Sequence, residues 1–158
     1  MTFHRLVVVA VVLSALIVCG CSDEKLSGGT YKLSQVSFSQ DECNLKEDIP
    51  EGHEIEVTIA EGTVKVYMAK DLSPPTGTIM GEAFTAFSTK LDDTLPGTNC
   101  RDMWIKKLTG KLVNKNSFAG VYEYTDKTVS GEDCADEEKV GFHGPVCTST
   151  MTFTATKK

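Results

Sequence analysis

Two runs of alternating residues decide the fold: EIEVTIA (Glu54–Ala60) and TVKVYMAK (Thr63–Lys70), joined by Glu61-Gly62. Successive side chains of a strand point to opposite faces, so regular alternation on both sides of a two-residue turn predicts an antiparallel hairpin. The expected register pairs apolar residues: Ile59 with Val64, Val57 with Val66, and Ile55 with Met68.

A second hairpin is expected from Met103–Val113 and Ser117–Lys127, around Asn114-Lys115-Asn116. Asparagine tolerates the left-handed conformation that a three-residue loop needs. On one face the register predicts the pairs Leu112 with Phe118, Gly110 with Gly120, and Leu108 with Tyr122. On the other face it pairs Lys107 with Glu123, a favourable cross-strand contact.

Three more strands are expected over Thr30–Ser39, Thr78–Thr89 and Cys147–Thr156. In the first, a bulge around Ser34-Gln35 would restore a single buried face. Gly- and Pro-rich loops separate the strands, and no convincing amphipathic helix occurs. We therefore predict one all-β domain over residues 30–158, a small antiparallel β-barrel (or sandwich) of about seven or eight strands with two disulfides.

The N-terminus carries a targeting signal. An apolar run, Leu6–Val18, follows Arg5 and is shorter than the roughly 20 apolar residues that a spanning helix needs, which is typical of a signal peptide. Val18, Cys19 and Gly20 before Cys21 resemble the lipobox of bacterial lipoproteins. This resemblance implies a signal peptide over residues 1–20 and cleavage before Cys21. The alternative is an ordinary cleaved signal, with Cys21 as a disulfide cysteine.

The lipoprotein resemblance also implies an anchor and a location. Cys21 would carry a diacylglyceryl thioether and a further acyl chain such as palmitate, and more than one chain makes anchoring in a lipid bilayer stable. Residues 21–29 would form a tether. Ser22 follows the lipidated cysteine, which favours the periplasmic face of the outer membrane of a Gram-negative bacterium.

Four of the six cysteines remain in the mature domain: Cys43, Cys100, Cys134 and Cys147. An even number in an exported domain predicts two disulfides. Cys134 and Cys147 lie between the last two expected strands, so we expect the pairs Cys134–Cys147 and Cys43–Cys100. There is no CxxC pair, and we expect no metal and no cofactor.

We expect no enzyme activity. No nucleophile elbow, zincin or phosphate-binding loop occurs, and the mature chain keeps only His53 and His143. The net charge of −6 argues against nucleic acid as a partner.

One face of the predicted sheet could bind a small apolar ligand or could simply fill the core. Its residues are Leu108, Leu112, Phe118, Tyr122, Met151 and Phe153. Gly29-Thr30-Tyr31 resembles the G-x-W motif of lipocalins, with Tyr in place of Trp. That resemblance implies an eight-stranded barrel whose cup binds small apolar molecules.

Ser27-Gly28 with Tyr31 also resembles the S-G-x-x-Y motif of small lysozyme-inhibitor lipoproteins, which are disulfide-containing β-barrels. Two acidic clusters could then face a basic envelope protein, or could simply be solvated surface. They are Asp41, Glu42, Glu47, Asp48 and Glu51, and Glu132, Asp133, Asp136, Glu137 and Glu138. The sequence therefore predicts a membrane-anchored envelope lipoprotein with a non-catalytic binding or structural β-barrel; an interaction or inhibitor protein is the alternative.

Overall fold

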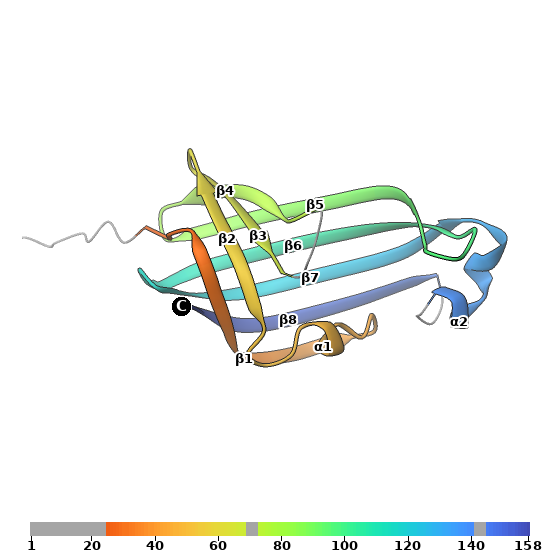
Figure 1. The fold of residues 1–158 in the computed structure, drawn as a ribbon, viewed down its shortest axis with the longest axis horizontal. Helices are drawn as coiled ribbons and strands as arrows, with labels where there is room; N and C mark the ends of the chain where they lie inside the picture. The colour runs from red at the N-terminus through yellow and green to blue at the C-terminus, as the bar shows by residue number, and fades with distance from the viewer. Residues whose placement is uncertain (1–24, 69–72, 141–144) are drawn as a thin grey trace, which may run out of the picture.

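The computed structural model describes residues 25–68, 73–140 and 145–158. Eight strands pair antiparallel in chain order, and the last also pairs with the first, so that the sheet closes into a barrel (Figure 1). The all-β prediction is confirmed, and of the two expected architectures the chain adopts the barrel.

The strands fall into two length classes. The three that follow one another as β2, β3 and β4 have five to seven residues, whereas the other five have 12 to 14. The bounds are β1 Gly29–Asp41, β2 Glu54–Ala60, β3 Thr63–Tyr67, β4 Thr76–Met80, β5 Ala83–Thr94, β6 Arg101–Asn114, β7 Ser117–Ser130 and β8 Val146–Lys157.

Three short helices lie in the connections: α1 Leu45–Asp48, η1 Glu132–Ala135 and α2 Glu137–Val140. No helix within residues 25–68, 73–140 and 145–158 has the length and apolar character needed to cross a membrane.

Both predicted hairpins are confirmed in their register. In the first, Ile59 pairs with Val64 and Val57 with Val66. In the second, Leu112 pairs with Phe118, Gly110 with Gly120 and Leu108 with Tyr122. The Lys107 ammonium and the Glu123 carboxylate form the expected ion pair on the outer face.

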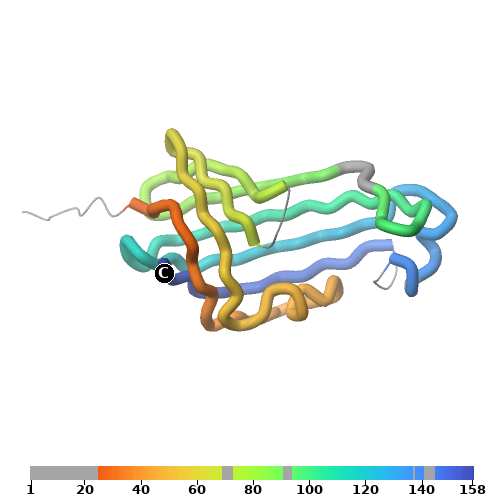
Figure 2. The backbone as a smooth tube through the Cα atoms, in the orientation of Figure 1, coloured from red at the N-terminus to blue at the C-terminus, as the bar shows by residue number. Residues whose placement is uncertain are grey.

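The bulge predicted in β1 is also confirmed. Gln35 has a φ of 55°, and the register with β8 shifts between Ser34 and Ser37. The backbone N–H groups of Gln35 and Val36 donate to the Glu51 carboxylate at 3.1 and 2.9 Å, which satisfies donors that the bulge removes from the ladder. The chain bends here (Figure 2): β1 pairs with β2 only before the bulge, whereas it pairs with β8 on both sides of it.

The single strand expected over Thr78–Thr89 is wrong. The chain reverses at Gly81-Glu82, where Gly81 has a φ of 60°, and Met80 pairs with Ala83 across the turn. The apolar residues on the two sides of this turn belong to two strands. The turn therefore adds one strand to the seven expected segments, and the total of eight lies within the predicted seven or eight.

The disulfide pairing expected from the sequence is also wrong, although all four cysteines are paired. The bonds are Cys43–Cys147 and Cys100–Cys134, with Cα–Cα distances of 5.2 and 4.8 Å. The expected pairing followed from β7 and β8 as hairpin neighbours, whereas the observed pairing depends on the contact between β1 and β8. That pairing sets Asp41 opposite Ser149, which brings Cys43 beside Cys147.

A row of four residues on the long strands packs aromatic rings on glycine. Phe84, Gly110, Gly120 and Phe153 lie opposite one another across β5, β6, β7 and β8. A Cβ atom on Gly110 would come within 2.2 Å of the Phe84 ring, and one on Gly120 within 2.4 Å of the Phe153 ring. Both aromatic rings therefore pack directly on glycine backbone, and the ring centroid of Phe118 lies 5.3 and 6.0 Å from theirs.

We predict that Gly110→Ala destabilises the fold by about 1–3 kcal/mol, because the added methyl group overpacks the site against Phe84. Urea denaturation measures the change, with Thr109→Ala on the outer face as the control. In the double variant with Phe84→Leu, the loss should be smaller than the sum of the two single losses. Strict additivity would contradict the ring-on-glycine packing.

We predict that replacing both cysteines of Cys43–Cys147 with serine destabilises the fold more than the same change at Cys100–Cys134. The sequence separations are 104 and 34 residues, and loop-closure entropy gives about 5 and about 4 kcal/mol. Peptide mapping without reduction checks the pairs, and urea denaturation of the two double variants checks the order. A larger loss at Cys100–Cys134 would contradict the entropy argument.

Candidate functional site

The inner face of the long strands is apolar along one part of its length and polar along another. Where β2, β3 and β4 complete the wall of the barrel, the inward residues are apolar. The next positions on β6 and β7 are Lys106 and Tyr124, then Trp104 and Asp126, and finally Asp102 on β6. Figure 1 shows the long strands continuing past the ends of β2, β3 and β4 toward η1 and α2.

Strand alternation places these side chains together. Lys106 lies directly opposite Tyr124, and Trp104 directly opposite Asp126. Directly opposed side chains of an antiparallel pair have Cβ atoms about 4.5–5.5 Å apart. We call Asp102, Trp104, Lys106, Tyr124 and Asp126 the inner polar patch.

Trp104 is 9% exposed, and its ring contacts the ammonium group of Lys106. The Nζ atom of Lys106 lies 3.9 Å from the centroid of the Trp104 ring, within the range of a cation–π interaction. Lys106 itself is only half-buried, so its ammonium group remains within reach of water. Trp104 is also the only tryptophan in the chain.

Asp126 is a buried carboxylate of the patch. Its side chain is 9% exposed, and its Oδ2 atom accepts a hydrogen bond of 3.0 Å from the Tyr124 hydroxyl. No N–H or hydroxyl group in the described part of the chain reaches its Oδ1 atom, and its side chain also hydrogen-bonds the neighbouring Asp102. Burial, and secondly the nearby Asp102 carboxylate, raise the pKa of Asp126 to about 6.

Tyr124 is the donor that this carboxylate does have. Burial and the negative charge of Asp126 raise the pKa of the Tyr124 hydroxyl well above its ordinary value. The phenol therefore keeps its proton and serves Asp126 as a hydrogen-bond donor.

The two disulfides hold the end of the barrel next to the patch. Cys147 is in register with Asp126, and its bond to Cys43 ties β1 to β8 there. Ser149, the next inward residue of β8, donates through its hydroxyl to Asp41 at 3.0 Å and accepts from the Cys43 N–H at 3.1 Å.

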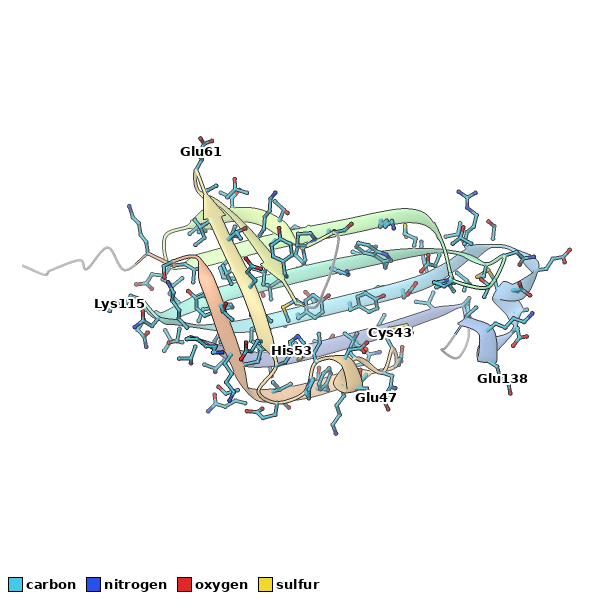
Figure 3. All side chains as sticks on the ribbon, viewed as in Figure 1. Cys43, Glu47, His53, Glu61, Lys115 and Glu138 are labelled. Atoms are coloured by element: carbon cyan, nitrogen blue, oxygen red, sulfur yellow. A yellow bond between two sulfur atoms is a disulfide. The ribbon has the colours of Figure 1, made fainter. Side chains whose placement is uncertain are left out.

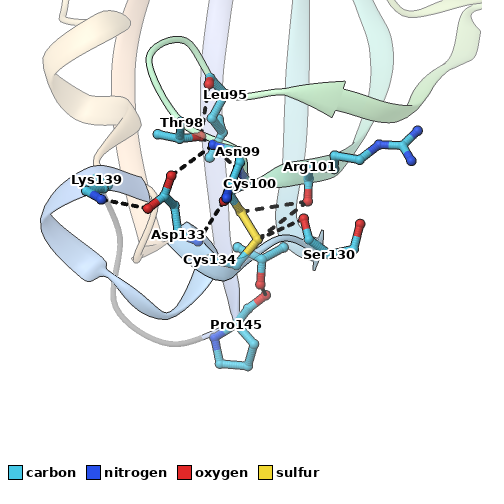
Figure 4. Close-up of a disulfide and its surroundings, with 11 residues drawn as sticks. Leu95, Thr98, Asn99, Cys100, Arg101, Ser130, Asp133, Cys134, Lys139 and Pro145 are labelled. Atoms are coloured by element: carbon cyan, nitrogen blue, oxygen red, sulfur yellow. Dashed lines mark hydrogen bonds and ion pairs between the residues drawn. A yellow bond between two sulfur atoms is a disulfide. The ribbon is translucent and has the colours of Figure 1, made fainter.

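The second disulfide is supported in the same way (Figure 4). The Asn99 N–H donates to the Asp133 carboxylate at 2.9 Å, and the Asp133 N–H donates to the Asn99 side-chain oxygen at 2.8 Å. These reciprocal bonds fix η1 beside Cys100, so the strands that carry the patch end in a cross-linked cap.

The six residues predicted as an apolar ligand face do lie together on the inner face of the barrel. They are buried, with exposed fractions of 0 to 8%: Leu108, Leu112, Phe118, Tyr122, Met151 and Phe153. This burial favours the core-filling alternative, and ligand binding by this face stays a prediction.

A hollow of about 600 Å³ lies on the outer surface of β5 to β8. The Gly110–Gly120 pair forms its floor, and the side chains around it are short, among them Thr85, Ala119 and Thr152. The only charged side chain that lines the hollow is that of Lys111.

Several carboxylates of the predicted acidic clusters have local partners. Asp41 accepts from the backbone N–H of Leu45, Glu42 from the Thr148 N–H, Glu51 from the β1 bulge, and Asp133 from Lys139 and Asn99. Glu47 and Glu138 point away from the barrel (Figure 3). A basic partner for these clusters stays a prediction.

The lipidation residue Cys21 and the signal peptide lie outside the described residues, as does His143. The described end of the expected tether packs on the barrel. Leu26 is buried, and the Ser27 carbonyl accepts a hydrogen bond of 2.6 Å from the Tyr31 hydroxyl. The Nε2 atom of His53 lies 2.6 Å from the carbonyl oxygen of Met68.

The inner polar patch was not among the predicted site residues, although the sequence contains a signal for it. The register that places Lys107 and Glu123 outside also places Lys106 and Tyr124 inside. Continuing the same parity by one step would have found Trp104 opposite Asp126.

Within residues 25–68, 73–140 and 145–158, no three His, Cys, Asp or Glu side chains are grouped so that they could hold a metal ion. Comparisons of the chain with family models, with curated proteins and with solved structures found no match.

We predict that Asp126→Asn removes a pH dependence of stability. The folded-state pKa of about 6 lies above the ordinary value of 3.8, so the folded state binds more protons between those values. The free energy of unfolding of the wild type should therefore fall, relative to that of the variant, by about 2 kcal/mol from pH 4 to pH 8.

Urea denaturation at several pH values measures this difference. Glu123→Gln, on the outer face of the same strand, is the matched control and should follow the wild-type profile. A constant difference between wild type and Asp126→Asn across this range would contradict the raised pKa.

Proposed function

We propose that the chain is a lipid-anchored, non-catalytic binding domain of the bacterial cell envelope, and that its ligand binds at the inner polar patch. The observation that carries the proposal is Asp126: a nine-tenths buried carboxylate whose Oδ1 atom is reached by no N–H or hydroxyl group of the described residues, directly opposite the only tryptophan. Buried polar groups are ordinarily hydrogen-bonded, so an unsatisfied one beside an aromatic ring is suited to a ligand.

The lipobox-like Val18–Cys21 segment supports the anchor, with Cys21 acylated and the domain on the periplasmic face of the outer membrane. The two disulfides support an oxidising compartment, since such bonds are rare in the cytosol. The filled apolar core supports a ligand bound beyond the ring rather than a deep apolar cup.

We predict that the protein, produced with its own N-terminus in a Gram-negative host and gently solubilised, carries acyl chains on Cys21 and retains a non-covalent ligand. Native mass spectrometry detects both. The ligand adduct should be lost in Trp104→Leu and in Asp126→Asn, because each removes one wall of the patch.

Phe87→Ala is the control, since Phe87 is an exposed aromatic residue on the outer face. It should retain the adduct. An unmodified Cys21 in the membrane fraction would contradict the anchor. A wild type without any adduct, or an adduct that survives both patch substitutions, would contradict the site.

A further inference from the structure

We infer that the inner polar patch recognises a primary ammonium group, which binds between the Trp104 ring and the Asp126 carboxylate in place of the Lys106 ammonium. The inference rests on the proposed binding function and names the chemical class of the ligand. It follows from three contacts of the patch.

The first contact shows that the Trp104 face accepts a cation. Lys106 Nζ lies 3.9 Å from the ring centroid, the position that a ligand ammonium would take. Because Lys106 is half-buried and carried on a flexible stem, its head group can move into water without disturbing the strand.

The second contact identifies what the ligand must donate. No N–H or hydroxyl group among the described residues reaches the Oδ1 atom of Asp126, whose carboxyl otherwise contacts only Tyr124, through Oδ2, and the carboxyl of Asp102. A ligand that fills this position must carry an N–H or O–H group. An alkylammonium ion supplies N–H donors together with the positive charge that the ring prefers.

The third contact is between two carboxyl groups. Asp102 is buried on the neighbouring strand, acts on Asp126 by its negative charge and also hydrogen-bonds its side chain. A cation bound between Trp104 and Asp126 would offset the negative charge of this pair, which a neutral or anionic ligand would not do.

The inference makes Lys106 a competitor of the ligand, so its removal should strengthen binding. We expect Lys106→Gln to bind n-butylammonium at least about threefold more tightly than the wild type, since no internal cation then occupies the ring. Asp126→Asn should weaken binding at least about tenfold, because it removes a charge-assisted hydrogen bond. Lys107→Gln and Glu123→Gln change the outer face of the same strands and should stay within about twofold of the wild type.

Fluorescence of Trp104 reports the titration at constant ionic strength, and calorimetry confirms it. Tetramethylammonium, which has the charge but no N–H, should bind more weakly than n-butylammonium, and n-butanol should not compete. Vesicles of phosphatidylethanolamine, compared with phosphatidylcholine, decide whether a lipid headgroup or a free amine supplies the ammonium. Circular dichroism checks that each variant is folded.

Weaker binding by Lys106→Gln, or equal binding of n-butylammonium by wild type and Asp126→Asn, would overturn the inference. So would a wild type that does not bind n-butylammonium. If native mass spectrometry still detects a ligand lost in the patch variants, the proposed binding function survives that failure. If native mass spectrometry detects no such ligand and n-butylammonium does not bind, both proposals are overturned.

Discussion

The pairing of β1 with β8 is the constraint on which the rest of the structure depends. It joins the first and last strands and closes an up-and-down sheet into a ring. β1 pairs with β2 only over Gly29–Lys32 but with β8 from Tyr31 to Asp41, and the bulge at Gln35, whose N–H group the Glu51 carboxylate satisfies, lies where the pairing with β2 has ended. The same pairing brings Cys43 to Cys147, so the most separated disulfide covalently repeats the ring closure.

Because β2, β3 and β4 are short, the ring covers only part of the long strands. Where it does, aromatic side chains pack on glycine and fill the interior. Past that point the inward positions of β6 and β7 are no longer covered by a facing sheet, and charged side chains occupy them. The polarity of the inner face therefore follows from strand length.

Much of the fold could be predicted from local patterns. The alternation in Glu54–Ala60 and the loop Asn114–Asn116 each determine a hairpin within a few residues, and both registers are confirmed. The disulfide pairing could not be derived in this way, because it depends on the contact between the first and last strands. The turn at Gly81 could not be derived either, because the apolar residues around it are equally compatible with one continuous strand.

The candidate site was missed for a different physical reason. In a strand pattern, inward positions are expected to be apolar. A polar residue at such a position therefore weakens the evidence for a strand and does not by itself indicate a site. Asp126 and Lys106 gain meaning only when the structure shows Trp104 opposite one and beside the other. A buried carboxylate raises the free energy of the folded state unless a cation or donor approaches it. The two disulfides beyond the patch restrain the ends of the strands that carry Asp126, so the fold can hold this carboxylate in place despite its cost.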